Sequence, residues 1–407
     1  MTPAPTTGRS VPPLTDTYLN FFADDYRWSH GLLMALGSAP YGGADVGEVY
    51  AVGRRLAGRQ GDDQAWFDEW CAMGDRLRSA AEGQLAAGRP ATAASSALRA
   101  CSYYQVGERF AVTKDDGALA VYRRSLDCFG LYLQHGSGPR ISRVEVPYDG
   151  GTGLPAYLVH PEPAAAAAGP APCVVFFDGL DITKELQYLR GVAEFSRRGI
   201  ACLIVDGPGN GESIRFRGRP LRYDYEVAGS AALDHLSTRA DIDPDRIAVM
   251  GISLGGYFAS RCAARDSRFA AVVAWGAIWD YHQRWQARLA AGFDLPMSVA
   301  GEHIAWALGA PTPEAAVVLL EDWRLEGVAR DITVPFLLLH GEDDRQVPLA
   351  EAEALLAEVS SADKTLRVFP RDEPGNQHCQ IDSLVPAIQE IADWLADRLH
   401  APAPSRR

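Results

Sequence analysis

Apolar residues recur every three or four positions along the first third of the chain. The stretch from Trp66 to Leu85 has this spacing, and the stretch from Ala91 to Phe110 repeats it. Such a period is typical of amphipathic helices, and no clear strand alternation interrupts it. We therefore predict a helical N-terminal domain over residues 15–139, preceded by a disordered tail at residues 1–14 that is rich in Thr and Pro.

The pattern changes after residues 136–139, which read G-S-G-P. Two alternating segments, 141–147 and 154–160, predict an antiparallel pair of edge strands. Short apolar runs then alternate with amphipathic stretches, which is typical of a mostly parallel sheet covered by helices on both faces. The predicted strands of this sheet are Cys173–Phe177, Ala201–Val205, Arg246–Met250, Ala270–Trp275, Phe336–His340 and Thr365–Phe369.

The helices predicted between these strands are Lys184–Arg198, Tyr223–Ser237, Tyr257–Ala264, Leu349–Val359 and Pro386–Leu399. Together with the strands they predict an α/β domain of about eight strands. We place this domain at residues 140–400 and a short tail at residues 401–407.

An unusually long connection separates the strands Ala270–Trp275 and Phe336–His340. It contains about 60 residues, many more than a crossover needs. The excess, at about residues 280–330, has a helical pattern and carries several tryptophans. We predict a helical insertion that forms the walls of a substrate pocket together with the N-terminal helices. Trp279, at its start, is a candidate pocket residue.

Charge and composition narrow the possible partners. The formal net charge is −13, and such a surface repels phosphate backbones, so we expect no nucleic-acid partner. No run of about 18 apolar residues predicts a membrane span, and residues 1–13 lack the apolar core of a signal peptide. We expect a cytoplasmic protein without membrane contact. The seven cysteines have scattered spacings and no C-x-x-C pair, which predicts neither a disulfide framework nor a zinc site.

One motif indicates covalent catalysis. Residues 251–255 read G-I-S-L-G and match the pattern G-x-S-x-G. They follow a predicted strand and precede a predicted helix, which is the context that this motif requires. The two glycines permit a turn that lifts the hydroxyl of Ser253 above the strand end, at a helix N-terminus that favours negative charge. We predict that Ser253 is a nucleophile.

A serine nucleophile needs a base that is oriented by an acid. After this motif the acid is expected before the base in the chain. Residues 340–348, H-G-E-D-D-R-Q-V-P, follow a buried strand and contain three carboxylates. The spacing favours Asp344 at the loop tip, with Asp343 as the alternative and Glu342 after it.

The base is sought among the histidines that follow Asp344, which are His378 and His400. His378 lies in a loop after the last predicted strand, where the base is expected, whereas His400 lies near the C-terminal end. We predict His378 as the base. His340, at the end of a predicted strand, is interpreted as structural.

Acyl transfer also needs N–H groups that bind the developing oxyanion. The predicted donors are the backbone N–H groups of Leu254, which follows the nucleophile, and of Leu180, in the loop after Cys173–Phe177. Other charged residues of that loop are expected to form caps and salt bridges: Asp181, Lys184 and Glu185. Residues 206–212, D-G-P-G-N-G-E, lack the Lys of a nucleotide loop and are interpreted as a turn.

Four motifs, in order, carry a family resemblance. They are D-G-L-D-I-T-K-E at 178–185, D-G-P-G-N-G-E-S at 206–213, G-I-S-L-G-G-Y at 251–257 and W-G-A-I-W-D-Y at 275–281. Together they resemble the α/β-hydrolase group that includes 2,6-dihydroxypseudooxynicotine hydrolase, fungal polyketide chain-shortening hydrolases and fermentation–respiration-switch esterase-like proteins. The resemblance extends from about residue 20 to 400, and residues 98–104, L-R-A-C-S-Y-Y, resemble a helix of the group's N-terminal domain.

This resemblance implies a helical N-terminal cap domain, frequent homodimers, no cofactor, and a triad at Ser253, Asp344 and His378. Some members use a further acid after the strand Ala270–Trp275. Here Asp280 is the nearest acid and His282 a second pocket candidate, with ordinary polar residues on the insertion as the alternative reading of both. The further aromatic candidates for the pocket are Tyr103 and Tyr104.

Several members of the group cleave carbon–carbon bonds next to a ketone, and others act on esters. A carbanion leaves only when its charge is delocalised, which predicts a β-dicarbonyl or a hydroxyaryl ketone. The aromatic residues of the N-terminal helices and of the insertion suit a flat, apolar, polyketide-like small molecule. An acyltransferase or cyclase with the same triad is the alternative, and a non-catalytic binding protein is a third hypothesis.

Overall fold

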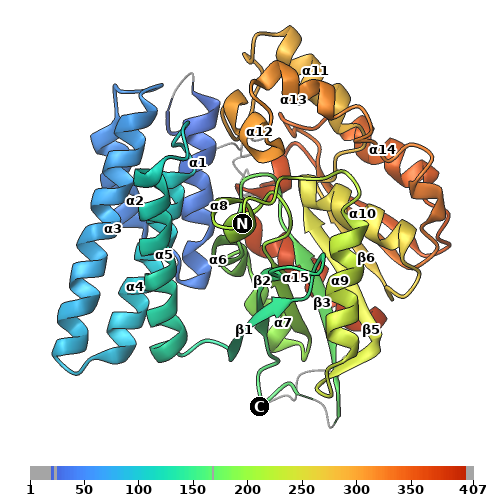
Figure 1. Ribbon diagram of the computed structural model, residues 1–407, viewed down its shortest axis with the longest axis horizontal. Helices are drawn as coiled ribbons and strands as arrows, with labels where there is room; N and C mark the ends of the chain where they lie inside the picture. The colour runs from blue at the N-terminus through green and yellow to red at the C-terminus, as the bar shows by residue number, and fades with distance from the viewer. Residues whose placement is uncertain (1–19, 23–24, 167–168, 400–407) are drawn as a thin grey trace, which may run out of the picture.

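The computed structural model describes residues 20–22, 25–166 and 169–399. The tails predicted at 1–14 and 401–407 lie outside these residues. Within them, eight strands form one sheet in the order β1-β2-β4-β3-β5-β6-β7-β8 (Figure 1). The strands are β1 (Ile141–Val146), β2 (Leu154–Val159), β3 (Ala171–Phe177), β4 (Ala201–Val205), β5 (Ile242–Ile252), β6 (Val272–Trp275), β7 (Phe336–Gly341) and β8 (Lys364–Phe369).

The strand directions follow the sequence pattern. The alternating strands β1 and β2 pair antiparallel, and β2 meets β4 antiparallel. All other neighbours pair parallel. Successive residues of β3 point to opposite faces of the sheet, so Val174 and Phe176 belong to one hydrophobic core and Val175 and Phe177 to the other. A strand that is buried on both faces reads as a continuous apolar run, as β3 does.

Helices cover both faces of the sheet. Those that follow β3, outside the connection between β6 and β7, are α6 (Lys184–Tyr188), α7 (Val192–Arg197), α8 (Gly211–Arg215), α9 (Glu226–Ser237), α10 (Leu254–Arg265), α14 (Leu349–Glu358) and α15 (Leu384–Leu399). The helix predicted over residues 184–198 is therefore two helices. Gly191 separates them with a φ of 90°, a left-handed conformation that interrupts the helix.

The long connection between β6 and β7 contains α11 (Tyr281–Ala290), α12 (Gly301–Leu308) and α13 (Pro313–Leu319). It leaves the sheet at the carboxyl end of β6, and Figure 1 shows these helices together beyond that end. Short 3-10 helices complete the structure: η1 (Ala39–Tyr41), η2 (Ala329–Asp331) and η3 (His378–Gln380). None of the helices in the described ranges is long and apolar enough to cross a membrane.

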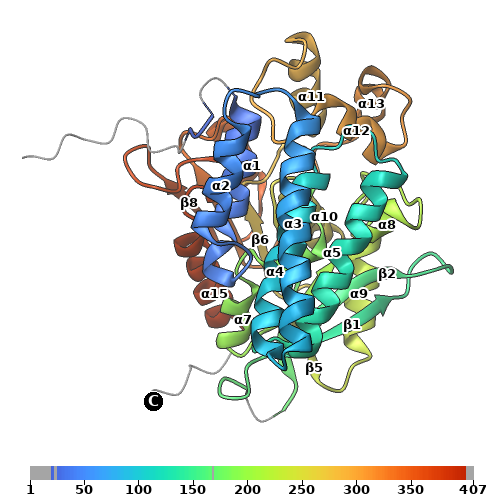
Figure 2. The same cartoon turned by 90° about the vertical axis from the view of Figure 1, so that its left-hand side faces the viewer.

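The N-terminal helices form a layer beside the sheet (Figure 2). They are α1 (Tyr26–Gly37), α2 (Val46–Leu56), α3 (Asp63–Ala86), α4 (Pro90–Glu108) and α5 (Asp116–His135). Aspartates cap four of them, because each carboxylate accepts a hydrogen bond from a free N–H of the first turn. Trp66 packs between Trp28 and Phe110, with ring centroids 5.1 and 4.4 Å away, and this aromatic cluster joins the core on one sheet face.

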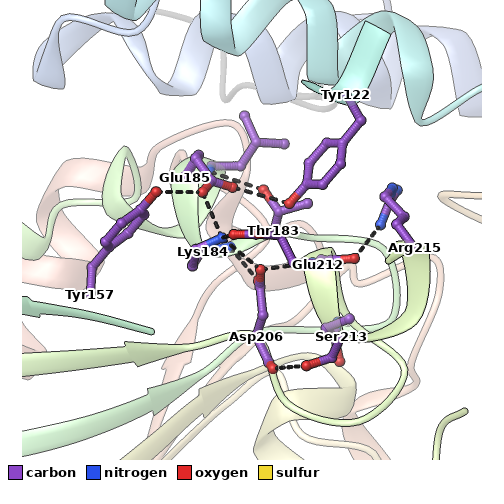
Figure 3. Close-up of polar contacts among 12 residues, drawn as sticks. Tyr122, Tyr157, Thr183, Lys184, Glu185, Asp206, Glu212, Ser213 and Arg215 are labelled. Carbon is purple, nitrogen blue, oxygen red and sulfur yellow. Dashed lines mark hydrogen bonds and ion pairs between the residues drawn. The ribbon is translucent and has the colours of Figure 1, made fainter. Parts of the chain in front are cut away.

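A buried charged network attaches this layer to the sheet (Figure 3). The Nζ atom of Lys184, at the start of α6, lies 2.8 Å from a carboxylate oxygen of Glu185 and 2.9 Å from one of Asp206. It also contacts Glu212. Burial opposes the charge of Lys184, but these carboxylates outweigh it and hold the pKa of Lys184 well above its usual value. The ammonium group therefore stays charged inside the protein.

The N-terminal helices bind this network through Glu185. Its carboxylate accepts hydrogen bonds from Gln105 on α4 and Tyr122 on α5, at 3.3 and 3.4 Å. Tyr157 of β2 donates to the other oxygen at 2.9 Å. A second buried pair reinforces the contact, since Arg215 of α8 lies 2.7 Å from Glu108 of α4. The two halves of the chain are thus joined by satisfied buried charges.

We expect the substitution Lys184→Met to lower the free energy of unfolding by about 3–5 kcal/mol, because it leaves buried carboxylates without their cation. Urea unfolding followed by circular dichroism measures this loss. The matched control is Arg78→Met, which removes an exposed pair with Glu82 on α3 and is expected to cost no more than about 0.5 kcal/mol. Equal losses in the two variants would show that the network does not stabilise the fold.

Candidate active site

Ser253 lies at the sharp turn between β5 and α10. Its φ is 58°, a left-handed conformation that is costly for a residue with a side chain. The flanking glycines make the turn possible. A Cβ on Gly251 would lie 1.9 Å from the carbonyl oxygen of Gly255, and one on Gly255 would lie 2.5 Å from that of Phe177. Only glycine fits at both positions, as the motif predicts.

The structure brings the three residues predicted for the triad together. The Nε2 atom of His378 lies 2.8 Å from the Oγ atom of Ser253, and its Nδ1 atom lies 2.6 Å from an oxygen of Asp344. The other oxygen of Asp344 accepts the backbone N–H groups of Gln346 and Val347 at 2.8 and 2.9 Å. The loops after β5, β7 and β8 supply the three side chains, because parallel strands end at one edge of the sheet.

The competing carboxylates have other partners. Asp343 pairs with the guanidinium of Arg371 at 2.7 Å, and Glu342 accepts the backbone N–H of Arg371 at 2.7 Å. His340 is fully buried, and its Nε2 atom lies 2.8 Å from the carbonyl oxygen of Val347. His400 is outside the described residues. Among the alternatives weighed from the sequence, only Asp344 contacts His378.

The electrostatics of the site couple His378 to Asp344. Burial raises the pKa of Asp344, but His378 and the backbone donors outweigh it and lower that pKa below its usual value. Burial likewise lowers the pKa of His378, and the charge of Asp344 outweighs it and raises that pKa. An ionised Asp344 requires the proton of His378 on Nδ1, so Nε2 is free to accept the proton of Ser253.

The two predicted oxyanion donors flank the nucleophile. Leu254 begins α10, and Leu180 lies in the loop after β3. Within the described ranges the N–H groups of both residues lack an acceptor. This loop passes directly beside the nucleophile, since a Cβ on Gly179 would lie 3.3 Å from the Cβ of Ser253. Two free N–H groups beside a serine hydroxyl match the requirement of an oxyanion site.

Asn210 holds this loop in place, a function that the sequence did not reveal. Its amide nitrogen donates to the carbonyl oxygens of Gly179 at 2.6 Å and Ile182 at 3.2 Å. The carbonyl of Gly179 is thereby fixed toward Asn210, which constrains the peptide that carries the N–H of Leu180. Residues 206–212 were interpreted only as a turn. The available signal was a polar side chain within a glycine-rich loop that follows the strand next to β3.

The pocket candidates on α4 bind other helices of the N-terminal layer through their hydroxyl groups. The hydroxyl of Tyr103 donates to Glu48 of α2 at 2.8 Å, and that of Tyr104 donates to Asp75 of α3 at 2.6 Å. Both phenols therefore lie within the helical layer and face its other helices. The adjacent residue Gln105 instead contacts Thr183 and Glu185 of the catalytic half. Helical spacing defines which residues share a face, but it does not identify the neighbour of that face.

The candidates at the start of α11 are engaged in structural contacts. Asp280 is the N-cap of this helix and accepts the N–H of Gln283 at 2.8 Å. The Nδ1 atom of His282 lies 3.2 Å from the guanidinium of Arg324. The backbone N–H of Trp279 donates to Glu351 at 2.9 Å. These contacts connect the insertion to α14 and to the segment before β7, and a pocket role for the three residues stays a prediction.

Buried polar residues from three other elements gather beside the oxyanion loop. Arg109, after α4, donates to the carboxylate of Asp181, and both side chains are buried. His30 of α1 and His303 of α12 are buried as well. Nothing in the sequence pattern connects residues so distant along the chain, so this group was not predicted. In the described part of the chain no cluster of three or more His, Cys, Asp or Glu side chains could hold a metal ion.

The fold and the geometry at Ser253 define an α/β-hydrolase, and comparison with known proteins agrees. Residues 187–401 match the model of the prolyl oligopeptidase family. Hydrolase LUC6 of Fusarium sp is 30% identical, over 89% of this chain and 94% of that protein. The 20-hydroxy-prefusarin hydrolase FUS2 of Gibberella moniliformis is 27% identical, over 92% and 96% of the two chains.

A solved structure supports the same assignment. The crystal structure of the 2,6-dihydroxy-pseudo-oxynicotine hydrolase superposes with a TM-score of 0.73 at 27% identity, covering 91% of this chain and 99% of that one. The chain belongs to the prolyl oligopeptidase family of α/β-hydrolases, and it is a hydrolase. The similarity extends through the N-terminal helices, which the family model itself does not include.

The substitution Asp344→Asn is expected to reduce kcat by about 10⁴-fold, because the histidine loses the partner that selects its tautomer. The charge of Asp344 raises the pKa of His378, and His378 must be neutral to accept a proton. We therefore expect the activity of the variant to persist to lower pH than that of the wild type. Profiles of kcat/KM against pH measure this shift. An unmoved acid limb would show that Asp344 does not control the charge of His378.

The substitution Asn210→Ala is expected to lower kcat by roughly 100-fold with little change in KM, because the loop that carries Leu180 loses its support. The matched control is Tyr225→Phe, which removes a hydroxyl 3.4 Å from the oxygen of Asn210 but keeps the amide donors. Steady-state kinetics with an aryl ester and a thermal melt of each variant provide the comparison. Unchanged kcat in a folded Asn210→Ala protein would exclude the supporting role.

Proposed function

We propose that this protein is a serine hydrolase that cleaves a carbon–carbon bond next to a ketone, or an ester, in a polyketide-like small molecule. The observation that carries this proposal is the hydrogen-bonded series Ser253–His378–Asp344. Beside it are the N–H groups of Leu180 and Leu254, which have no acceptor among the residues that the structure describes. A nucleophile, an oriented base and two oxyanion donors are the elements that acyl transfer requires.

In this mechanism His378 takes the proton of Ser253 while the Oγ atom attacks the substrate carbonyl carbon. The N–H groups of Leu180 and Leu254 bind the resulting oxyanion. When the tetrahedral intermediate collapses, the leaving group departs with the bonding electron pair, as an alkoxide or a delocalised carbanion, and His378 protonates it. Water then attacks the acyl group on Ser253, and His378 carries its proton back to the serine. The products are a carboxylic acid and the protonated leaving group.

A small substrate is supported by the cover over the site. His378 is 5% exposed, and helices from both the N-terminal layer and the insertion surround the group beside the oxyanion loop. The relatives support the same class, because their names specify 20-hydroxy-prefusarin and 2,6-dihydroxy-pseudo-oxynicotine, which are small organic molecules. A folded polypeptide would not reach a nucleophile covered in this way.

The nucleophile can be tested with a fluorophosphonate probe and a panel of aryl esters and β-diketones. We expect a single adduct on Ser253 by intact-protein mass spectrometry, and loss of both the adduct and about 10⁶-fold of kcat in Ser253→Ala. The matched control is Ser260→Ala on α10, whose hydroxyl only donates to the carbonyl of Gly256. Labelling or turnover that survives in Ser253→Ala would refute the proposal.

The fate of the acyl group separates hydrolysis from the alternative chemistries. In water enriched in ¹⁸O, hydrolysis incorporates one labelled oxygen into the acid product. A transferase or cyclase would pass the acyl group to a hydroxyl or a carbanion, so its product would contain none. If the protein showed no labelling and no turnover, that result would support the hypothesis of a non-catalytic binding protein.

Two further expectations belong to this proposal. Assembly as a homodimer follows from the family resemblance, and light scattering on a sizing column tests it. A cytoplasmic location is also part of this proposal, and fractionation of cells that produce the protein tests it. Neither expectation affects the proposed chemistry.

A further inference from the structure

A buried ion pair connects the end of α4 to the oxyanion loop. The Nε atom of Arg109 donates to Asp181, and the two side chains are 2% and 8% exposed. The Nη1 atom of Arg109 is also buried, yet it has no hydrogen-bond partner in the described part of the chain. A buried cationic donor without an acceptor is costly, so this atom is expected to face a ligand or a water molecule.

Two histidines near this pair also have a buried ring nitrogen without a hydrogen-bond partner. The Nε2 atom of His303 and the Nδ1 atom of His30 are buried and lack partners within the described ranges. Arg109 and His303 line a common recess together with Phe110 and Val299. Its volume is about 10 Å³, which is close to the space of one water molecule. The recess therefore suits a single oxygen atom and not a ring.

The charges of this group favour a substrate oxygen that becomes negative. Burial, together with Lys114, lowers the pKa of His303 to about 3. Burial, Arg109 and His378 lower the pKa of His30 well below its usual value. Both rings are therefore neutral near pH 7, and Arg109 supplies the positive charge. The carboxylate of Asp181 accepts a hydrogen bond from Nε of Arg109 and leaves the Nη1 atom available to donate to a substrate oxygen.

The group adjoins the loop that carries the oxyanion donor Leu180, through the pairing of Arg109 with Asp181. Asp181 follows Leu180 directly, and neighbouring Cα atoms are about 3.8 Å apart. Gly179 in the same loop approaches Ser253 closely. His30 is within electrostatic reach of both Arg109 and His378. A substrate whose carbonyl oxygen is held by Leu180 can therefore extend another oxygen toward Arg109.

We propose that Arg109, with His303 and His30 beside it, forms a subsite for a second substrate oxygen, and that the substrate is an enolisable 1,3-dicarbonyl compound. This inference rests on the hydrolase function proposed above. It assigns to Arg109 the binding of the carbonyl that is not attacked by Ser253.

The subsite acts when the carbon–carbon bond breaks. Ser253 forms a bond to the first carbonyl carbon, and collapse of the tetrahedral intermediate breaks the bond between that carbon and the central carbon. The electron pair passes through the central carbon to the second oxygen, which becomes an enolate bound by Arg109. His378 then returns its proton to the central carbon, which yields a ketone and the acyl-enzyme. Water releases the acyl group as an acid, so no further reactant is required.

The test compares two substrates, an aryl 1,3-diketone and an aryl ester that lacks a second carbonyl. The substitution Arg109→Lys keeps a cation beside Asp181 but removes the Nη1 donor. We expect the ratio of kcat/KM for the diketone to that for the ester to fall by about 100-fold. His303→Phe keeps the ring beside Trp306, and it is expected to lower the same ratio by up to about tenfold.

The matched control is Arg190→Lys, because Arg190 pairs with Asp178 of the same loop at 3.3 Å but does not line the recess. Its ratio should equal that of the wild type. If Arg109→Lys and His303→Phe lowered kcat/KM equally for the two substrates, the subsite proposal would be overturned. It would also be overturned if the wild-type enzyme were labelled on Ser253 and hydrolysed esters but no diketone. An absence of labelling and of all turnover would instead overturn the proposed function itself.

Discussion

The requirement that the structure depends on most is the neutralisation of the buried ammonium group of Lys184. A charge without water must be surrounded by opposite charges at short range. Here the carboxylates come from α6, from the end of β4 and from α8, and Glu185 is in turn bound by α4 and α5 (Figure 3). Five segments of the chain are therefore positioned relative to one cation.

The same network determines where the oxyanion loop lies. Thr183, which precedes Lys184, donates to Gln105 of α4, and Asn210, between Asp206 and Glu212, donates to the loop at Gly179. The two ends of the loop are thus hydrogen-bonded to Gln105 and Asn210, and both of these residues are positioned by the buried charged network. The N-terminal helices are consequently a structural part of the catalytic half, because their docking and the direction of the Leu180 N–H depend on the same contacts.

The sequence predicts the parts of the site that have local signals. Ser253 is marked by flanking glycines, and Asp344 and His378 lie in loops after strands whose apolar runs are evident. The structure brings these three together, whereas the hydroxyl groups of Tyr103 and Tyr104 bind Glu48 and Asp75 within the N-terminal layer. The contact of Asn210 with Gly179 and the pairing of Arg109 with Asp181 could not be predicted, since they join segments 31 and 72 residues apart that meet only through tertiary packing. Periodicity identifies a buried face but not its partner.

A triad of this kind attacks many carbonyl compounds, so selection among substrates must come from groups that surround it. Arg109 is suited to this task, because its ion pair with Asp181 connects the N-terminal layer to the loop that carries Leu180. A substrate oxygen on Arg109 would engage the same rigid body that holds the oxyanion donor. Binding at the second oxygen would therefore also orient the first carbonyl, and recognition and catalysis would share one set of contacts.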